Sequence, residues 1–155
     1  MSSFSIDEHK SFMGWAKHAA SNSKCIRRQV GAVIVGNQGV YTQVHNGPSC
    51  RSTHALQEGC LRNKLNIPSG TRQEICRGLH AEQDAIAQAA RNGFSTDDAI
   101  MYCTLHPCSV CAKMIIAAGI TRVYYSEDYT DMLAAKLFEE AGISTTKLQD
   151  FREIR

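Results

Sequence analysis

Residues 80–111 read HAEQDAIAQAARNGFSTDDAIMYCTLHPCSVC, and the rest of the chain is organised around them. Apolar residues recur at helical spacing over Leu79–Asn92 and stop at a glycine, so this segment is predicted to be a helix. A short apolar run predicts a strand over Ile100–Thr104, and the helical pattern returns over Cys108–Ala118. A helix, a strand and a second helix in this order are typical of an α/β fold.

The flanking segments continue this alternation. Helices are predicted over Ile6–Ser21 and Asp131–Ala141, and strands over Val30–Val35, Val40–Val44, Arg122–Tyr125 and Ile143–Thr146. Ser5 and Glu8 have the spacing of a capping box for the first helix, and Trp15 is expected to anchor that helix in the core. Because strands alternate with helices after residue 80, we expect parallel pairing there and a mixed sheet sandwiched by helices.

Composition narrows the class of protein. The length of 155 residues suits a single domain spanning 1–155, with 43% hydrophobic and 21% charged residues. A net charge of +2 without a basic stripe argues against a nucleic-acid partner. We expect no signal peptide and no membrane segment, because there is no apolar span of about 18 residues. Seven cysteines without a secretory signal favour metal binding or free thiols in the cytoplasm.

Four residues of the central stretch carry the chemistry. His80, Cys108 and Cys111 are three ligands of the kind that Zn²⁺ prefers, and they leave a fourth tetrahedral position for water. Glu82 lies two residues from the histidine and can move protons without joining the ligands. The spacing H-x-E followed by P-C-x-x-C is the signature of zinc-dependent nucleobase deaminases. Both motifs are predicted to begin helices, where free N–H groups favour a thiolate.

A structural zinc site is the alternative interpretation. Such a site is normally closed by four protein ligands, and Cys103 or His106 could supply the fourth. A lone C-x-x-C pair would be a weak indication. The two motifs together, each at a helix start, favour the hydrolytic site.

Several segments resemble the deoxycytidylate (dCMP) deaminase family of the cytidine deaminase-like superfamily. They are Cys25-x-Arg-Arg-x-Val-Gly-Ala-Val-Ile-Val35, Asn46-Gly47, His80-Ala-Glu82, Ala90-Arg-Asn-Gly93 and Thr104-Leu-His-Pro-Cys-x-x-Cys-Ala-Lys113. This resemblance implies a three-layer α/β/α fold with a mixed five-stranded sheet. It also implies Zn²⁺ bound by His80, Cys108 and Cys111, and Glu82 as the proton shuttle.

The resemblance further implies a small nucleotide as the substrate. Asn46 would contact the nucleotide, and the backbone N–H groups of Ala81 and Cys108 would lie close to the base. Tyr129 follows a strand at the edge where parallel sheets bind ligands, so we expect it either to stack on a pyrimidine or to pack against the next helix. Members of the family are commonly homo-oligomers, hexamers or dimers, and some are regulated by dCTP and dTTP.

Residues 45–55 depart from the family pattern, in which a tyrosine precedes the asparagine. His45 stands in place of that tyrosine, and Ala55 in place of a cysteine. The resemblance makes conversion of dCMP to dUMP and ammonia the first expectation. Because this loop selects the substrate, its altered sequence also leaves a second interpretation open. The alternative is a deaminase of another small aminoheterocycle, such as a cytosine nucleoside or a nucleoside triphosphate. A non-catalytic zinc-binding module is a third possibility, against which the intact zinc motif speaks.

The long connection over 46–78 contains further potential ligands. Cys25, Cys60 and Cys76, together with His54, could bind a second, structural zinc, as in some relatives. Alternatively, these cysteines are small buried apolar residues. A short helix is predicted within the connection, over His54–Asn63.

Overall fold

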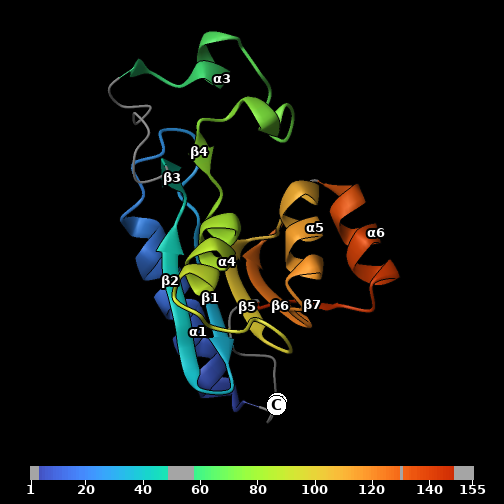
Figure 1. The fold of residues 1–155 in the computed structure, drawn as a ribbon. Coiled ribbons are helices and arrows are strands. Elements are labelled where there is room, and N and C mark those ends of the chain that lie inside the picture. Colours follow the sequence, from blue (N-terminus) through green and yellow to red (C-terminus); the bar gives the residue numbers. More distant parts are fainter. Residues whose placement is uncertain (1–3, 49–57, 130, 149–155) are drawn as a thin grey trace.

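The computed structural model describes residues 4–48, 58–129 and 131–148. Five strands form a sheet with the order β2-β1-β5-β6-β7 (Figure 1). They are β1 (Gly31–Gly36), β2 (Gly39–His45), β5 (Ile100–Leu105), β6 (Arg122–Glu127) and β7 (Ser144–Lys147). Strand β1 runs antiparallel to β2 and β5, whereas β5, β6 and β7 are parallel. The predicted mixed, five-stranded sheet is therefore confirmed.

Helices cover both faces of this sheet (Figure 1). One face carries α1 (Ile6–Ser21), and the other carries α4 (Ala81–Arg91), α5 (Ser109–Ala117) and α6 (Met132–Glu140). Alternate residues of β1 face the two layers: Val33 and Val35 pack beneath α1, and Ala32 and Ile34 pack beneath the other helices. Three layers result, as the resemblance implies. No helix in these described ranges is long and apolar enough to cross a bilayer.

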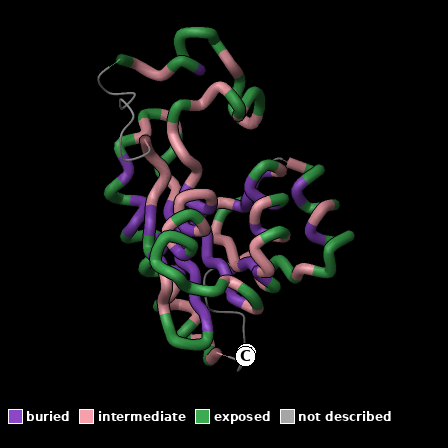
Figure 2. Tube along the Cα trace, viewed as in Figure 1, coloured by how far each residue is buried: buried purple, intermediate pink, exposed green. Residues whose placement is uncertain are grey.

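Strand β1 is the centre of the core. All six of its residues are buried, as its continuous apolar sequence predicts for a strand inside a sheet (Figure 2). Its first residue, Gly31, allows α1 to approach closely, since a Cβ there would lie 1.9 Å from the carbonyl oxygen of Ala16. A glycine at this position thus brings the helix layer against the sheet.

Helix α1 has the predicted bounds and the predicted cap. Ser5 Oγ accepts a hydrogen bond from the Glu8 N–H at 3.3 Å, and the Glu8 carboxylate accepts one from the Ser5 N–H at 2.8 Å. The prediction for Trp15 is wrong, because this side chain is 44% exposed. Met13 and Ala16 point at the sheet, which leaves Trp15 on the flank of the helix against the Phe12 ring.

The two ligand-bearing helices begin later than predicted. Leu79 belongs to a two-residue strand, β4 (Gly78–Leu79), which pairs with β3 (Gly47–Pro48), so α4 starts only at Ala81. Cys108 likewise precedes α5 as its N-cap. Pairing with a distant segment, which local pattern does not reveal, explains the first difference.

The connection between β3 and β4 contains only short elements in its described part. These are α3 (Leu61–Lys64) and a 3₁₀ turn, η1 (Gln73–Ile75). Helix α3 overlaps the end of the predicted helix His54–Asn63, and residues 54–57 lie outside the described ranges.

Candidate active site

One edge of the sheet gathers the ends of four strands. The parallel strands β5 and β6 end at this edge, and β1, antiparallel to β5, begins there. Strand β2 also ends at this edge, because its last residue, His45, pairs with Gly31. The β3–β4 pair then places the residues after His45 beside the start of α4. Chain segments that are far apart in sequence therefore meet at one place.

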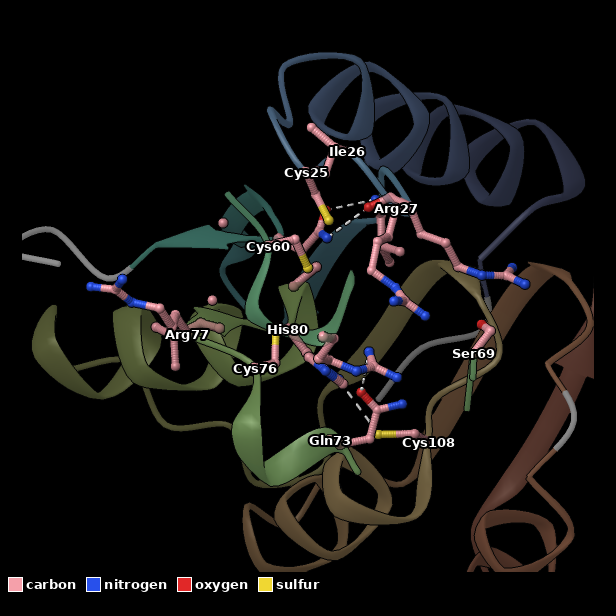
Figure 3. Close-up of a pocket in the computed structure, with 18 of the residues that line it drawn as sticks. Cys25, Ile26, Arg27, Cys60, Ser69, Gln73, Cys76, Arg77, His80 and Cys108 are labelled. Atoms are coloured by element: carbon pink, nitrogen blue, oxygen red, sulfur yellow. Dashed lines mark hydrogen bonds between the residues drawn. The ribbon is translucent and has the colours of Figure 1, made fainter. Parts of the chain in front are cut away.

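A pocket opens where these segments meet (Figure 3). Its walls come from the turn before β1, the β3 segment, the 59–79 connection, the start of α4 and the residues after β5 and β6. Most of the predicted site residues line it, namely Asn46, His80, Ala81, Glu82, Cys108 and Tyr129. Cys111 lies behind this wall and is fully buried.

The three predicted metal ligands converge. His80 Nδ1 lies 3.5 Å from Cys108 Sγ and 3.3 Å from Cys111 Sγ, and the three ligand atoms all lie within 4.8 Å of one another. Nitrogen and sulfur ligands of a tetrahedral Zn²⁺ are about 3.6 Å apart, so the donor set fits this ion. Gln83 supports the arrangement, because its Oε1 accepts the His80 N–H at 2.9 Å.

A fourth protein ligand does not join this group among the described residues. His106 is buried, with Nδ1 2.9 Å from its neighbour's carbonyl and its ring edge-on to Tyr125. Cys103 is buried in β5 and lies outside the ligand group. Neither residue provides the closure that a structural zinc site normally requires.

Burial and hydrogen bonding set the protonation of the site. Burial raises the pKa of Glu82, which is only 4% exposed, and the nearby His80 partly offsets this rise. Hydrogen bonding from Cys111 lowers the pKa of Cys108 to about 4, against the effect of burial and with further help from His80. The same hydrogen bond, together with burial, raises the pKa of Cys111. The two thiols therefore titrate as a coupled pair, which loses its first proton more readily than its second.

Asn46 holds the turn before β1 in addition to facing the pocket. Its Oδ1 accepts hydrogen bonds from Ser23 Oγ at 2.7 Å and from the Val30 N–H at 2.8 Å, and its Nδ2 donates to the Arg28 carbonyl at 2.8 Å. One N–H of the amide is left for a ligand in this arrangement. The sequence suggested the ligand contact and missed the structural role.

Two further residues that line the pocket were not predicted from the sequence. Arg62 is 7% exposed and donates hydrogen bonds to Gln73 Oε1, the Pro68 carbonyl and the Thr71 carbonyl. Gln73 in turn donates to the Tyr129 hydroxyl at 2.8 Å. This network ties the connection to the residue after β6 and makes it a wall of the pocket. Sequence offers no signal for it, because arginines are rarely buried.

The second zinc site remains a prediction. Cys25, Cys60 and Cys76 all line the pocket (Figure 3), but the described residues do not bring the three thiols together as a ligand group. His54, the fourth predicted ligand, lies outside the described ranges.

Comparisons with known proteins agree with this geometry. Residues 6–127 match the family described as the cytidine and deoxycytidylate deaminase zinc-binding region. ComE operon protein 2 of Bacillus subtilis is 37% identical over 93% of this chain and 72% of that protein. Deoxycytidylate deaminase of Saccharomyces cerevisiae is 34% identical over 93% of this chain, which spans only 46% of the yeast protein.

A solved structure is similar to this chain over nearly its whole length. Cyanophage S-TIM5 dCMP deaminase, in complex with dCMP and dUMP, superposes with a TM-score of 0.78 at 28% identity, over 94% of this chain and 100% of that one. The family match includes the three convergent ligands and the buried glutamate. The chain therefore belongs to the cytidine and deoxycytidylate deaminase family.

Proposed function

We propose that this protein is a zinc-dependent hydrolase that converts dCMP and water to dUMP and ammonia. The observation that carries this proposal is the buried carboxylate of Glu82 in a pocket shared with the ligands His80 and Cys108. The relatives named deoxycytidylate deaminase, and the similar structure with bound dCMP and dUMP, support the choice of substrate.

The reaction breaks the bond between C4 of the pyrimidine and its amino group and forms a C4–O bond with water. Zn²⁺ held by His80, Cys108 and Cys111 would lower the pKa of a water molecule and orient its oxygen. Glu82 takes one proton from the attacking water and transfers it to ring N3. It then carries the other proton of that water, from the new C4 hydroxyl, to the departing amine, so that a C4 carbonyl and ammonia form. The raised pKa of Glu82 suits this role, because the protonated form must persist between the two transfers.

Other residues would hold the nucleotide. Ala81 begins α4 and Cys108 caps α5, so neither N–H has an acceptor within its helix, and both would donate hydrogen bonds to the base. The remaining N–H of Asn46 would donate to the sugar or base. Tyr129 would form the wall beside the pyrimidine, held by Gln73.

A panel of substrates with ammonia release as the readout tests this function. The panel contains dCMP, deoxycytidine, dCTP and a non-nucleotide aminoheterocycle, each with and without added dCTP and dTTP as effectors. We expect dCMP to be the best substrate. No turnover of dCMP beside fast turnover of another amine would overturn the proposed substrate.

Variants of two glutamates test the catalytic role. Glu82→Gln should lower kcat by roughly a hundred- to ten-thousandfold while zinc remains bound. Glu140→Gln, on the exposed surface of α6, is the matched control and should keep the parent's activity. Full activity of Glu82→Gln would instead favour a non-catalytic zinc-binding module.

We also infer a homo-oligomer, a hexamer or a dimer, acting in the cytoplasm. Large apolar side chains that remain exposed on the described surface are consistent with association; they include Trp15, Phe94, Met132 and Leu133. Light scattering after size-exclusion chromatography measures the number of subunits, and a monomer at micromolar concentration would contradict the inference.

A further inference from the structure

His45 directly precedes the proposed nucleotide ligand Asn46, at the position where the family pattern has a tyrosine. It is the last residue of β2 and pairs with Gly31, the first residue of β1. Its side chain is half-buried, and it is not among the described residues that line the pocket. An effect of His45 on the nucleotide therefore has to act through a neighbouring residue.

The imidazole of His45 contacts the backbone of this neighbour. Its Nδ1 lies 3.0 Å from the carbonyl oxygen of Asn46. Because a carbonyl oxygen only accepts hydrogen bonds, Nδ1 carries a proton and donates it here. A tyrosine has its donor at the far end of the ring and could not donate to a carbonyl so close to its own backbone. This hydrogen bond thus depends on the histidine that distinguishes the chain from the family pattern.

The hydroxyl of Ser23 shows why the Asn46 carbonyl needs this donor. Ser23 Oγ lies 2.9 Å from the carbonyl oxygen of Asn46 and 2.7 Å from its side-chain Oδ1. A hydroxyl has only one proton, so Ser23 can fully satisfy one of these two oxygens at a time. When His45 donates to the carbonyl, the proton of Ser23 is left for the side-chain oxygen.

The side-chain amide of Asn46 is the group that would bind the nucleotide. Its Oδ1 accepts from Ser23 and from the Val30 N–H, and its Nδ2 donates to the Arg28 carbonyl. These three contacts fix the plane of the amide, and hence the direction of the N–H that remains for a ligand. Without the His45 donor, the carbonyl would compete for the Ser23 proton, and Oδ1 would keep one full donor in place of two.

The ring of His45 also lies near α4. Burial raises the pKa of Asp84 on this helix, whereas the hydrogen bond from Gln88 and the nearby His45 lower it. Asp84 lies two residues after Glu82, so the imidazole has neighbours both in the segment that would bind the nucleotide and on the helix that carries the proposed proton shuttle. A test has to separate the Nδ1 side of the ring from the rest of it.

We propose that His45 is a positioning residue for the nucleotide, because its hydrogen bond to the Asn46 carbonyl keeps the Asn46 amide in the orientation that binds dCMP. The inference rests on the proposed function, since it concerns how the same substrate is held. It assigns the unusual residue of this loop to substrate binding and leaves the chemistry to Glu82 and the metal ligands.

Variants of His45 that differ in the place of the donor test this role. His45→Phe has no donor and should raise the KM for dCMP about five- to tenfold while kcat stays within about twofold. The amide nitrogen of an asparagine lies roughly where the imidazole has Nδ1, and that of a glutamine roughly where it has Nε2. His45→Asn should therefore recover most of the lost affinity, whereas His45→Gln should not.

Gln43 offers a matched control on the same strand. Its side chain also donates to a backbone carbonyl, that of Trp15, but on the exposed surface away from the pocket. Gln43→Leu should keep the KM for dCMP within about twofold of the parent's, because one surface hydrogen bond is lost without effect on Asn46.

A double-mutant cycle tests whether His45 acts through Asn46. His45→Phe should change the KM little when Asn46→Ala is already present, because the amide that it positions is gone. The Kd of the zinc-loaded enzyme for dUMP, measured by calorimetry, gives the same comparison without turnover. The contrast between His45→Asn and His45→Gln decides by itself if one of the other variants fails to fold.

The outcomes separate this inference from the proposed function. A parent-like KM in His45→Phe, or equal losses in His45→Asn and His45→Gln, would overturn the positioning role while the deaminase proposal stands. A lower kcat with an unchanged KM in His45→Phe would do the same, because the residue would then act on the chemistry. A parent that turns over another amine but not dCMP would overturn the proposed substrate, and the inference with it.

Discussion

The carboxylate of Asp131 accepts a hydrogen bond from the backbone N–H of Ser109 at 2.7 Å, across two helices. Its other oxygen accepts the Ala134 N–H at 3.2 Å and so caps α6. Ser109 begins α5 directly after the ligand Cys108, so one side chain holds the starts of both helices. Partial burial opposes ionisation, but the N–H donors of Ser109 and Ala134 outweigh it and lower the pKa of Asp131.

Asp131→Ala should lower the free energy of unfolding by about 1–2 kcal/mol, because two helices lose their cap. Since the pKa of Asp131 is lower in the folded state, its contribution is present above the ordinary aspartate pKa and is lost as the pH falls through the folded value. Urea unfolding at several pH values measures both effects. The difference between the variant and the parent should therefore shrink in acid.

Asp128→Ala is the control for this prediction. Asp128 forms an ion pair with Lys147 on the surface, so its removal should change the stability by less than about 1 kcal/mol. An Asp131→Ala variant as stable as this control would show that the double cap contributes nothing.

Cys111→Ser should weaken zinc binding more than about a hundredfold, since even residues that only support a metal ligand can contribute that much. Cys103→Ser removes a neighbouring buried thiol outside the ligand group and should keep its zinc. Zinc per chain, measured after dialysis against a mild chelator, distinguishes the two variants. Equal zinc contents would contradict the assignment of Cys111.

The same measurement on the parent protein decides the second zinc site. One zinc per chain in fully active protein would remove the site predicted at Cys25, Cys60, Cys76 and His54. Two zincs, reduced to one by Cys60→Ser without loss of Cys111 binding, would support it.

Gly31→Ala should destabilise the fold by roughly 1–3 kcal/mol, because the added methyl group would lie 1.9 Å from the Ala16 carbonyl and force α1 away from β1. Gly14→Ala, in the same helix layer, has no atom within 4 Å of the added group. It should raise the stability by about 0.5–1 kcal/mol, because alanine favours a helix. Thermal unfolding of both variants measures the contrast, and equal shifts of Tm would refute the close approach.

Gln73→Leu should raise the KM for dCMP about fivefold and leave kcat within about twofold, since one hydrogen bond that holds Tyr129 is lost while Glu82 and the metal ligands are unchanged. Gln88→Leu, which removes a hydrogen bond to Asp84 on α4, is the control and should keep the parent's KM. Steady-state kinetics with dCMP measure KM and kcat for both variants and for the parent. A fall in kcat with an unchanged KM in Gln73→Leu would mean that the connection acts on the chemistry itself.

Elements governed by local rules were predictable from sequence. The bounds of α1 follow from its capping box, and the interior position of β1 follows from its apolar residues. Trp15 shows the limit, because helical spacing reports a face but not how far that face extends into the core. The start of α4 was misplaced because Leu79 pairs with Gly47, a partner that lies across the long connection.

The sequence by itself determined the ligand types, the candidate proton shuttle Glu82 and the α/β order, since residue chemistry and short-range spacing carry that information. Only the tertiary structure decided that Arg62 is buried, that Asp131 caps two helices, and that the Arg28 guanidinium lies over the Tyr129 ring. The physical reason is that the burial and hydrogen bonding of a side chain depend on the groups that surround it in the folded protein. Those partners come from segments that only folding brings together.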